Sequence, residues 1–232
     1  MISPQMAGLL REISVLALPA IFAITLHEAA HGYVALRCGD DTALRMGRVT
    51  FNPLRHIDLF GTVLMPVLLF LLTHGQFLFG YAKPVPVNFN RLNRPRRDMV
   101  WVALAGPAVN VLLIVISALL FFLAPHLPAT FREWFELNLV NSVIVNFILA
   151  AFNMIPLPPL DGGRVAVGIL PDALAFPLAR MERYGMLLLI GVLILLPLVG
   201  TQLGIDLNLF GHVVDGPVNW ILGAIGKITG VG

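Results

Sequence analysis

The chain has 232 residues, of which 58% are hydrophobic and only 12% are charged. Because an ordinary soluble domain carries about 25% charged residues, this composition excludes that class and predicts an integral membrane protein. The formal net charge of +2 is too small to suggest a nucleic-acid partner. The single cysteine, Cys38, excludes an internal disulfide and a metal site built from several cysteines.

Five apolar runs carry no charged residue, or only Glu28 in the first of them. Each is long enough on paper for a transmembrane helix, which needs about 20 mostly apolar residues. A sixth segment, 206–232, contains Asp215, Lys227 and several glycines, and is predicted to be an interfacial C-terminal helix. We expect an all-α polytopic membrane protein with four to six transmembrane helices, forming one membrane-embedded domain over residues 1–232. The five runs are 13–36, 59–82, 99–131, 137–160 and 184–205.

The basic residues predict that segment 59–82 enters the membrane and returns to the same side. Loops 37–58 and 83–98 are both rich in Arg, and positive residues favour the cytoplasmic face. A segment that crosses the membrane cannot leave both loops on that face. The Gly and Pro residues within 59–82 also suit a re-entrant segment better than a continuous helix. The alternative is an ordinary short span that violates the charge rule.

Two short segments in these loops, 46–52 and 85–90, alternate apolar and polar side chains. Such alternation is typical of strands, and it predicts small β-strands at the membrane surface. His56 and Asp58 lie between the first of these segments and the re-entrant segment. We favour a structural role in the loop for both. Two alternatives stay open: they bind a metal ion themselves, or they support metal ligands from elsewhere in the chain.

The first apolar run contains His27-Glu28-Ala29-Ala30-His31, an H-E-x-x-H pattern. Residues four apart share one face of a helix, so both imidazoles can reach one metal ion, and Glu28 lies close enough to act on a metal-bound water. An ionisable residue inside a membrane helix costs roughly 2.5–3.5 kcal/mol on insertion scales and usually has a function. The pattern predicts a metal site, with a polar contact between helices as the alternative.

A third metal ligand must come from elsewhere in the chain, because catalytic zinc usually takes three protein ligands and one water. Asp161 is the best candidate, since it follows a proline-rich stretch that must end the fourth apolar run and bend the chain. Gly162 and Gly163 let another part of the backbone approach closely. An aspartate here can equally cap the next helix, and the residues alone leave both interpretations open.

Three motifs occur in order along the chain: the H-E-x-x-H at 27–31, an Ala-Gly-Pro-x-x-Asn at 105–110, and an Asn-x-x-Pro followed by Leu-Asp-Gly at 153–162. Together they resemble the site-2 protease family of intramembrane zinc metalloproteases. The resemblance implies one Zn²⁺ per chain, bound by His27, His31 and Asp161. It implies that Glu28 is the catalytic base. It also points to a short form of the family, without a PDZ-like or nucleotide-sensing domain.

Asn110 and Asn153 belong to these motifs and lie inside apolar runs. We hypothesise that one or both point at the zinc site as catalytic residues, where they hold the substrate carbonyl or stabilise the oxyanion. The alternative is a hydrogen bond between helices, worth about 0.6 kcal/mol on average.

The predicted function is hydrolysis of peptide bonds in or near the transmembrane segments of other membrane proteins. The expected partners are a transmembrane protein substrate and the lipid bilayer, and the sequence leaves the oligomeric state open. We expect a multi-pass protein of the plasma membrane with its active site towards the cytoplasm. One alternative is a non-proteolytic protein of the same fold that binds membrane helices, which has no need of Glu28. A less favoured one is a metal or proton transporter, which needs ligands across both leaflets.

Overall fold

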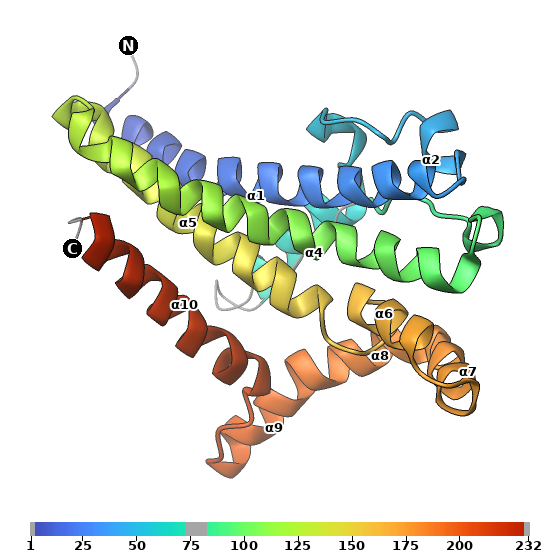
Figure 1. Cartoon of the computed structure of the whole chain (residues 1–232). Coiled ribbons are helices and arrows are strands. Elements are labelled where there is room, and N and C mark those ends of the chain that lie inside the picture. The colour runs from blue at the N-terminus through green and yellow to red at the C-terminus, as the bar shows by residue number, and fades with distance from the viewer. Residues whose placement is uncertain (1–2, 73–82, 230–232) are drawn as a thin grey trace.

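Three long helices form the bundle at the centre of the molecule (Figure 1). The computed structural model describes residues 3–72 and 83–229. In it α1 (Pro4–Arg37), α4 (Pro95–Leu120) and α5 (Ala129–Asn153) pack pairwise against one another. Within the described residues these are the three helices long and apolar enough to cross a membrane, α4 being continued by η4 (Phe121–His126). A helical membrane protein is thereby confirmed, while the total of four to six spans stays a prediction.

Local sequence signals set the ends of these helices. The Oγ atom of Ser3 accepts a hydrogen bond from the Met6 N–H at the start of α1. The first turn of α4 holds Pro95, whose missing N–H needs no partner there. Pro128 precedes α5, which therefore begins before the charged stretch 132–136. The apolar run 137–160 had suggested a start after that stretch.

Small residues fill the contacts between the helices, and large apolar residues face outward. Ala23 and Ala29 of α1 and Ala103 and Gly106 of α4 are buried. Membrane helices gain little from hydrophobic burial against each other, so close backbone approach between small residues is what packs them. The outward side chains include Phe22, Leu112 and Leu119, each more than half exposed. This distribution is what an apolar solvent around the bundle demands.

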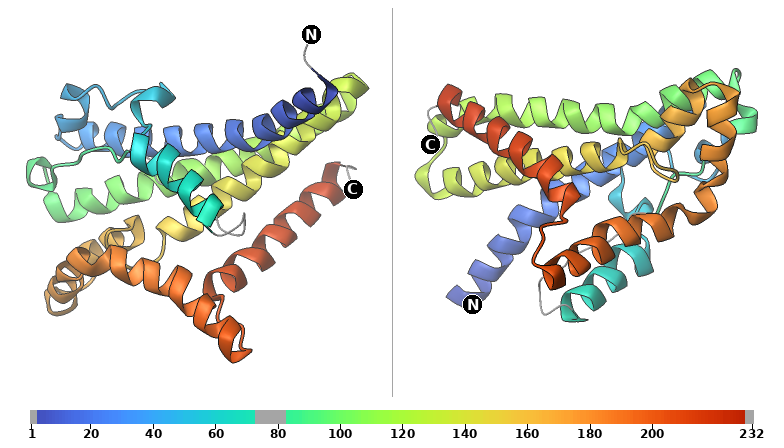
Figure 2. Two further views of the ribbon diagram at one scale, coloured as in Figure 1. Left: turned by 180° about the vertical axis from the view of Figure 1, so that it is seen from behind. Right: turned by 90° about the horizontal axis from the view of Figure 1, so that it is seen from below.

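The apolar segment 59–82 begins as a helix. η2 (Leu59–Leu64) leads into α3 (Met65–Leu72), which lies behind the bundle in Figure 1 and in front of it in Figure 2, left. At 1.5 Å per residue this helical part extends roughly 21 Å, less than the about 30 Å of a bilayer core. Residues 73–82 lie outside the described residues, so the re-entrant path of the whole segment stays a prediction.

The β-strands expected at 46–52 and 85–90 are not confirmed. The first segment consists of turns and bends, and the second is extended chain that runs into the short 3-10 helix η3 (Phe89–Arg91). Their backbone donors are used elsewhere. In the first segment the Gly47 and Arg48 N–H groups bond to carbonyls of α2. In the second, the Val85 N–H bonds to the Glu28 carboxylate, and the Asn88 N–H bonds to that of Asp40. Both segments instead lie against α1, where Val49 and Val85 approach Gly32. The alternation reflects packing on a helix rather than pairing of strands.

The C-terminal third adds shorter helices around the bundle (Figure 2). α6 (Asp161–Ile169) packs against α4, and α10 (Leu209–Thr229) packs against α5. The left-handed residue Gly204, with φ of 68°, ends α9 and turns the chain towards α10. A helix therefore occupies most of 206–232, and its interfacial position stays a prediction. The remaining elements are α2 (Thr42–Arg45), η1 (Pro53–Arg55), α6 (Asp161–Ile169), α7 (Asp172–Arg180), α8 (Glu182–Ile190), η5 (Gly191–Leu195), α9 (Leu196–Leu203) and α10 (Leu209–Thr229).

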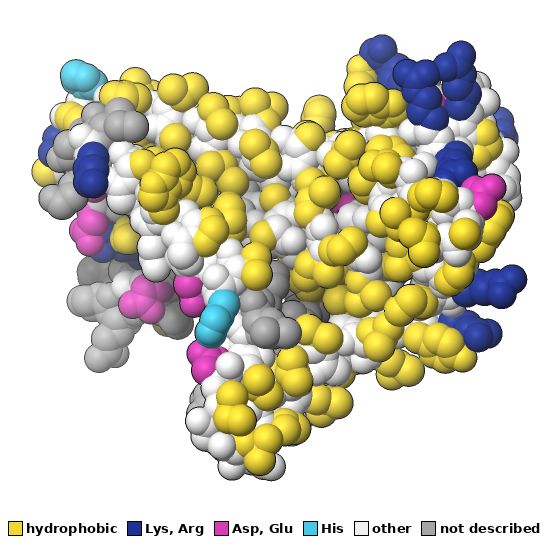
Figure 3. Space-filling view, turned by 60° about the horizontal axis from the view of Figure 1, so that its bottom comes forward, with side chains coloured by type: hydrophobic (Ala, Val, Ile, Leu, Met, Phe, Trp, Pro, Cys, Tyr) yellow, Lys and Arg dark blue, Asp and Glu magenta, His cyan; other side chains and the backbone are white. Residues whose placement is uncertain are grey.

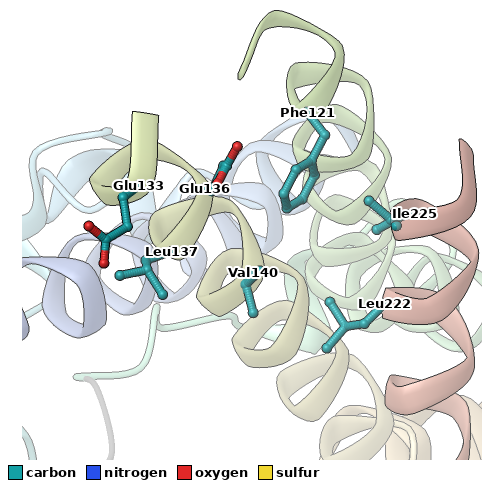
Figure 4. A pocket seen from close by; sticks show the side chains of 8 residues that line it. Phe121, Glu133, Glu136, Leu137, Val140, Leu222 and Ile225 are labelled. Carbon is teal, nitrogen blue, oxygen red and sulfur yellow. The ribbon is translucent and has the colours of Figure 1, made fainter. Parts of the chain in front are cut away.

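A cavity of about 260 Å³ lies between α5 and α10 (Figure 4). It is bordered by the early turns of α5, which carry Glu133 and Glu136, and by Leu222 and Ile225 of α10. None of the predicted site residues lines it. The functional site must therefore be built from other contacts.

Candidate metal centre and active site

His27, His31 and Asp161 meet inside the molecule and form what we call the ligand cluster. The two imidazole Nε2 atoms are 3.0 Å apart. The Asp161 Oδ2 atom lies 3.3 Å from the Nε2 of His27 and 3.2 Å from that of His31. All three side chains are buried. Across residues 3–72 and 83–229 they are the one group of three potential ligands close enough to hold a single ion.

The chain between α5 and α6 carries Asp161 to the histidines. α5 ends at Asn153, and the loop folds back over the first turn of α6, so that a Cβ at Gly162 would lie 2.3 Å from the Met154 carbonyl oxygen. A Cβ at Gly163 would lie 2.2 Å from the Pro158 nitrogen. Only glycine fits at both positions. Asp161 opens α6, yet no side chain caps that helix, so the capping interpretation gives way to a carboxylate aimed at the imidazoles.

The donor set fits zinc in chemistry and in spacing. Two imidazole nitrogens and one carboxylate oxygen are ordinary ligands of catalytic zinc, which leaves a fourth position for water. At zinc–ligand distances of about 2.0–2.1 Å, tetrahedral ligands lie about 3.3–3.4 Å apart. The three separations in the cluster are 3.0, 3.2 and 3.3 Å. The buried Oδ2 atom of Asp161 also has no hydrogen-bond partner among the described residues. Binding to a metal ion would satisfy this oxygen.

The main chain of α4 lies directly beside the cluster at Gly106. A Cβ built there would come within 2.5 Å of both His27 Cε1 and His31 Nε2. Real Cβ atoms do not approach other heavy atoms below about 3.0 Å. The glycine of the Ala-Gly-Pro motif is therefore needed for space at the metal ligands.

The tautomer of His31 is fixed by a backbone carbonyl. Its Nδ1 atom lies 2.7 Å from the Val102 carbonyl oxygen, and both groups are buried. A carbonyl oxygen only accepts, so Nδ1 carries the proton and Nε2 keeps the lone pair that a metal requires.

Asp161 is ionised, as a metal ligand must be. Burial opposes ionisation of this carboxyl, but while no metal ion is bound, imidazole N–H groups of His27 and His31 that face it outweigh burial and hold its pKa well below the ordinary range. A bound metal ion would take the place of those protons. The cluster thus pairs one negative charge with two nitrogen donors before any ion enters.

Glu28 is half-buried on α1 beside the cluster. Its Oε2 atom accepts a hydrogen bond of 2.7 Å from the Val85 N–H. Val85 belongs to the extended segment 83–88, which is also tied to the loop before η2 by a bond from the Lys83 N–H to the His56 carbonyl. The carboxylate that the sequence proposes as base is therefore held in place by a segment far away in the chain.

The two motif asparagines are placed differently. Asn110 is completely buried on α4, with its Oδ1 atom 2.6 Å from His27 Nδ1. Asn153 is half-buried, and its Nδ2 atom donates to the Leu149 carbonyl of its own helix. The structure brings Asn110 to the cluster, whereas the hydrogen bond of the Asn153 side chain stays within α5. Their catalytic roles stay predictions.

Sequence reasoning missed Asn146, which is 1% exposed and bonded to Asn110 across the α4–α5 contact. A signal was available, because Asn146 precedes the motif residue Asn153 by seven residues and so shares its face of α5. His56 and Asp58 fit the loop role that we favoured. The ring of His56 bonds to the Thr50 carbonyl, and Asp58 caps η2 through the Gly61 N–H.

Comparison with known proteins identifies the family. The family model for peptidase family M50 matches residues 15–198, a stretch that contains every member of the ligand cluster. The chain belongs to peptidase family M50. The resemblance to site-2 proteases is thereby confirmed, and this M50 peptidase is a zinc metalloprotease.

The relatives of this M50 peptidase are also named as zinc metalloproteases. YwhC of Bacillus subtilis is 37% identical over 79% of this chain and 81% of its own length. Rip2 of Mycolicibacterium smegmatis is 28% identical over 75% of this chain and 64% of its own. Rip2 of Mycobacterium tuberculosis is 30% identical over 61% of this chain and 52% of its own. All three are named as zinc metalloproteases. No solved structure matches the chain significantly.

Proposed function

We propose that this M50 peptidase hydrolyses peptide bonds in or near transmembrane segments of other membrane proteins, using one Zn²⁺ held by His27, His31 and Asp161. The observation that carries the proposal is the burial of this ligand cluster within a bundle of helices long enough to cross a membrane. Zinc bound there supplies a Lewis acid for the scissile carbonyl and lowers the pKa of its bound water towards about 7.

Glu28 is the proposed general base. It follows His27 directly, and the Val85 N–H fixes one oxygen of its carboxylate. We propose that this carboxylate accepts the proton of the attacking water and then delivers it to the leaving amine. His27, His31 and Asp161 would hold the zinc ion. Asn110 would hold the His27 imidazole through the contact between its Oδ1 atom and His27 Nδ1.

The proposed partners are a transmembrane protein substrate and the lipid bilayer. Large apolar side chains on the outside of the bundle support the lipid contact. Lys and Arg side chains gather at the end of the molecule formed by α2, α7 and the start of α4 (Figure 3). That charge bias supports a plasma-membrane orientation with this end in the cytoplasm. His27 precedes Arg37, the last residue of α1, by a rise of roughly 15 Å, which supports an active site towards the same side.

The transporter alternative is disfavoured by the distribution of ligands. A transporter needs polar groups along a path through both leaflets. The part of the chain that the structure describes contains no second group of three potential metal ligands. A non-proteolytic helix-binding protein has no need of the Glu28 carboxylate beside the ligand cluster, which disfavours that alternative.

The decisive experiment compares the wild-type chain with Glu28→Gln, purified in detergent and mixed with a membrane-protein reporter substrate. Both proteins should contain about one zinc per chain, because Glu28 is not a ligand, while cleavage should fall about 10²–10⁴-fold in the variant. Glu12→Gln, an exposed position on the same helix, is the matched control and should keep full activity. Cleavage that survives Glu28→Gln would refute the assigned base, and a zinc-free wild type would refute the metal centre.

A further inference from the structure

Two buried amide side chains link the ligand cluster to the main chain of α5, and we call Asn110 and Asn146 the amide relay. Asn110 lies with Oδ1 2.6 Å from His27 Nδ1, and its Nδ2 donates to Asn146 Oδ1 at 2.8 Å. The Nδ2 atom of Asn146 donates in turn to the Ser142 carbonyl oxygen at 2.8 Å. Both amides are at most 1% exposed. Hydrogen bonds in such a low-dielectric interior are strong, and a wrongly oriented amide is costly.

The polarity of the relay follows from its far end. The Ser142 carbonyl oxygen only accepts, so Asn146 must present its NH₂ group there and its Oδ1 to Asn110. Asn110 must then present NH₂ to Asn146, which leaves its own Oδ1 facing His27. An oxygen at that position accepts, so the His27 Nδ1 atom carries the proton. The lone pair on Nε2 is left facing His31 and Asp161.

We infer that Asn146 is a positioning residue for metal binding, because through Asn110 it selects the His27 tautomer whose Nε2 atom can accept a metal ion. The inference rests on the metal centre proposed above and adds a residue that the motifs do not contain. His31 receives the same tautomer directly from the Val102 carbonyl. Within residues 3–72 and 83–229 the hydrogen-bond partner of His27 Nδ1 is the Asn110 amide, so His27 receives this tautomer through the relay.

Without Asn146, the Asn110 amide can turn over, and His27 can adopt its other tautomer. The Nδ2 atom of Asn110 would retain only the Ala23 carbonyl at 3.5 Å, which is too long for a good hydrogen bond. The amide is then free to turn its NH₂ group towards His27, which moves the imidazole proton to Nε2. That proton would point at Asp161 Oδ2, 3.3 Å away, and satisfy the cluster without a metal.

The test measures zinc affinity rather than cleavage, on the full chain in detergent, by competition with a chromophoric chelator. Asn146→Leu keeps the branched shape of the side chain and removes both hydrogen bonds. Its zinc dissociation constant should rise about 10–100-fold, the usual cost of losing a partner of a metal-bound histidine. Asn141→Leu is the matched control, since Asn141 joins α5 to α1 through the Val15 carbonyl and takes no part in the relay. It should bind zinc as the wild type does.

Two further variants separate orientation from packing. In Asn146→Asp the protonated carboxyl can donate its O–H to the Ser142 carbonyl and still accept from Asn110, so this variant should restore most of the affinity that Asn146→Leu loses. Asn110→Asp places a carboxylate beside His27, which accepts the Nδ1 proton in either orientation. In that background Asn146→Leu should cause no further loss of affinity. If Asn146 served packing alone, Asn146→Asp would not restore zinc affinity. Asn146→Leu would then also lower the affinity further in the Asn110→Asp background.

The outcomes distinguish the two proposals. A wild type that binds no zinc refutes the metal centre, and the inference with it. Wild-type binding that Asn146→Leu leaves unchanged refutes the relay alone. Additive losses in the Asn110→Asp background also refute it, because they assign Asn146 to packing. If circular dichroism shows that Asn146→Leu does not fold, Asn146→Ala replaces it in the same comparisons with the same expected results.

Discussion

At the scale of single residues, Gly106 sets the room available to the metal ligands. We expect Gly106→Ala to weaken zinc binding by at least about tenfold, because a Cβ within 2.5 Å of both imidazoles must push the rings or α4 aside. Elemental analysis and chelator competition on the purified variant measure the effect. Gly216→Ala, where an added Cβ meets no atom within 4 Å, should keep wild-type zinc. Full zinc affinity in Gly106→Ala would show that α4 does not pack this closely.

The residues of the ligand cluster and Asn110 were predictable, whereas Asn146, which bonds to Asn110, was not predicted. His27 and His31 are fixed by helical periodicity within one short motif, and Asp161 follows from the breaker residues before it together with the family resemblance. The link from Asn110 to Asn146 depends on how α4 and α5 are rotated against each other. Sequence periodicity gives the faces of one helix but not the register between two. For that reason Asn153 was selected and Asn146 was missed.

At the scale of elements, Asp40 fastens the extended segment 83–88 to the end of α1. Its carboxylate is buried and accepts hydrogen bonds from the Asn88 N–H at 2.7 Å and the Thr42 N–H at 3.0 Å. Burial opposes ionisation, but these bonds, the Thr42 hydroxyl and the charge of Arg91 outweigh it and lower the pKa of Asp40 from its ordinary 3.8. The same segment carries Val85, so Asp40 helps to hold the group that positions Glu28.

A depressed folded-state pKa makes the stability contribution of Asp40 dependent on pH. The contribution is complete above the unfolded value near 3.8 and is lost as the pH falls through the lower folded value. Asp40→Asn should therefore lower the unfolding free energy by about 1–3 kcal/mol at pH 7, with a difference that shrinks below about pH 4. Thermal unfolding in detergent across this pH range measures it. A difference that persists unchanged at pH 2 would contradict the assignment.

Asp41→Asn is the matched control for this series. Asp41 is a partly exposed neighbour that pairs with Arg45 and Arg91 at the surface. Surface ion pairs contribute about 0–1 kcal/mol, so its effect at pH 7 should be the smaller of the two.

The helices of the fold followed from apolar length, whereas the surface segments did not follow from alternation. The runs that became α1, α4 and α5 are apolar over a length that only a helix can use in a membrane. The segments 46–52 and 85–90 show the period of a strand, but a strand also needs a partner with free backbone groups. In 85–90 the side chains of Glu28 and Asp40 accept hydrogen bonds from two of those backbone donors, and no periodicity in the sequence reports such long-range bonds.

At the scale of the whole molecule, the Arg-rich end and the α4–α5 connection should face opposite sides of the membrane. We expect Thr130→Cys, at an exposed position beside that connection, to react with a membrane-impermeant thiol reagent on intact cells. Arg97→Cys, exposed at the start of α4, should react only after permeabilisation. Both changes are made with Cys38→Ala, which removes the only native thiol. The reverse pattern would invert the orientation, and equal labelling would show that α4 does not cross.

The outward placement of large apolar side chains reverses the usual rule for which substitutions a protein accepts. At Phe22 or Leu119, which are exposed on the outside of the bundle, one bulky apolar residue can replace another because nothing of fixed shape packs against them. At Ala23 or Ala103 a single added methylene must separate two helices. Variation in this chain is therefore limited by volume on the inside and by hydropathy alone on the outside, so the spacing of its smallest residues specifies the bundle more than its largest ones do.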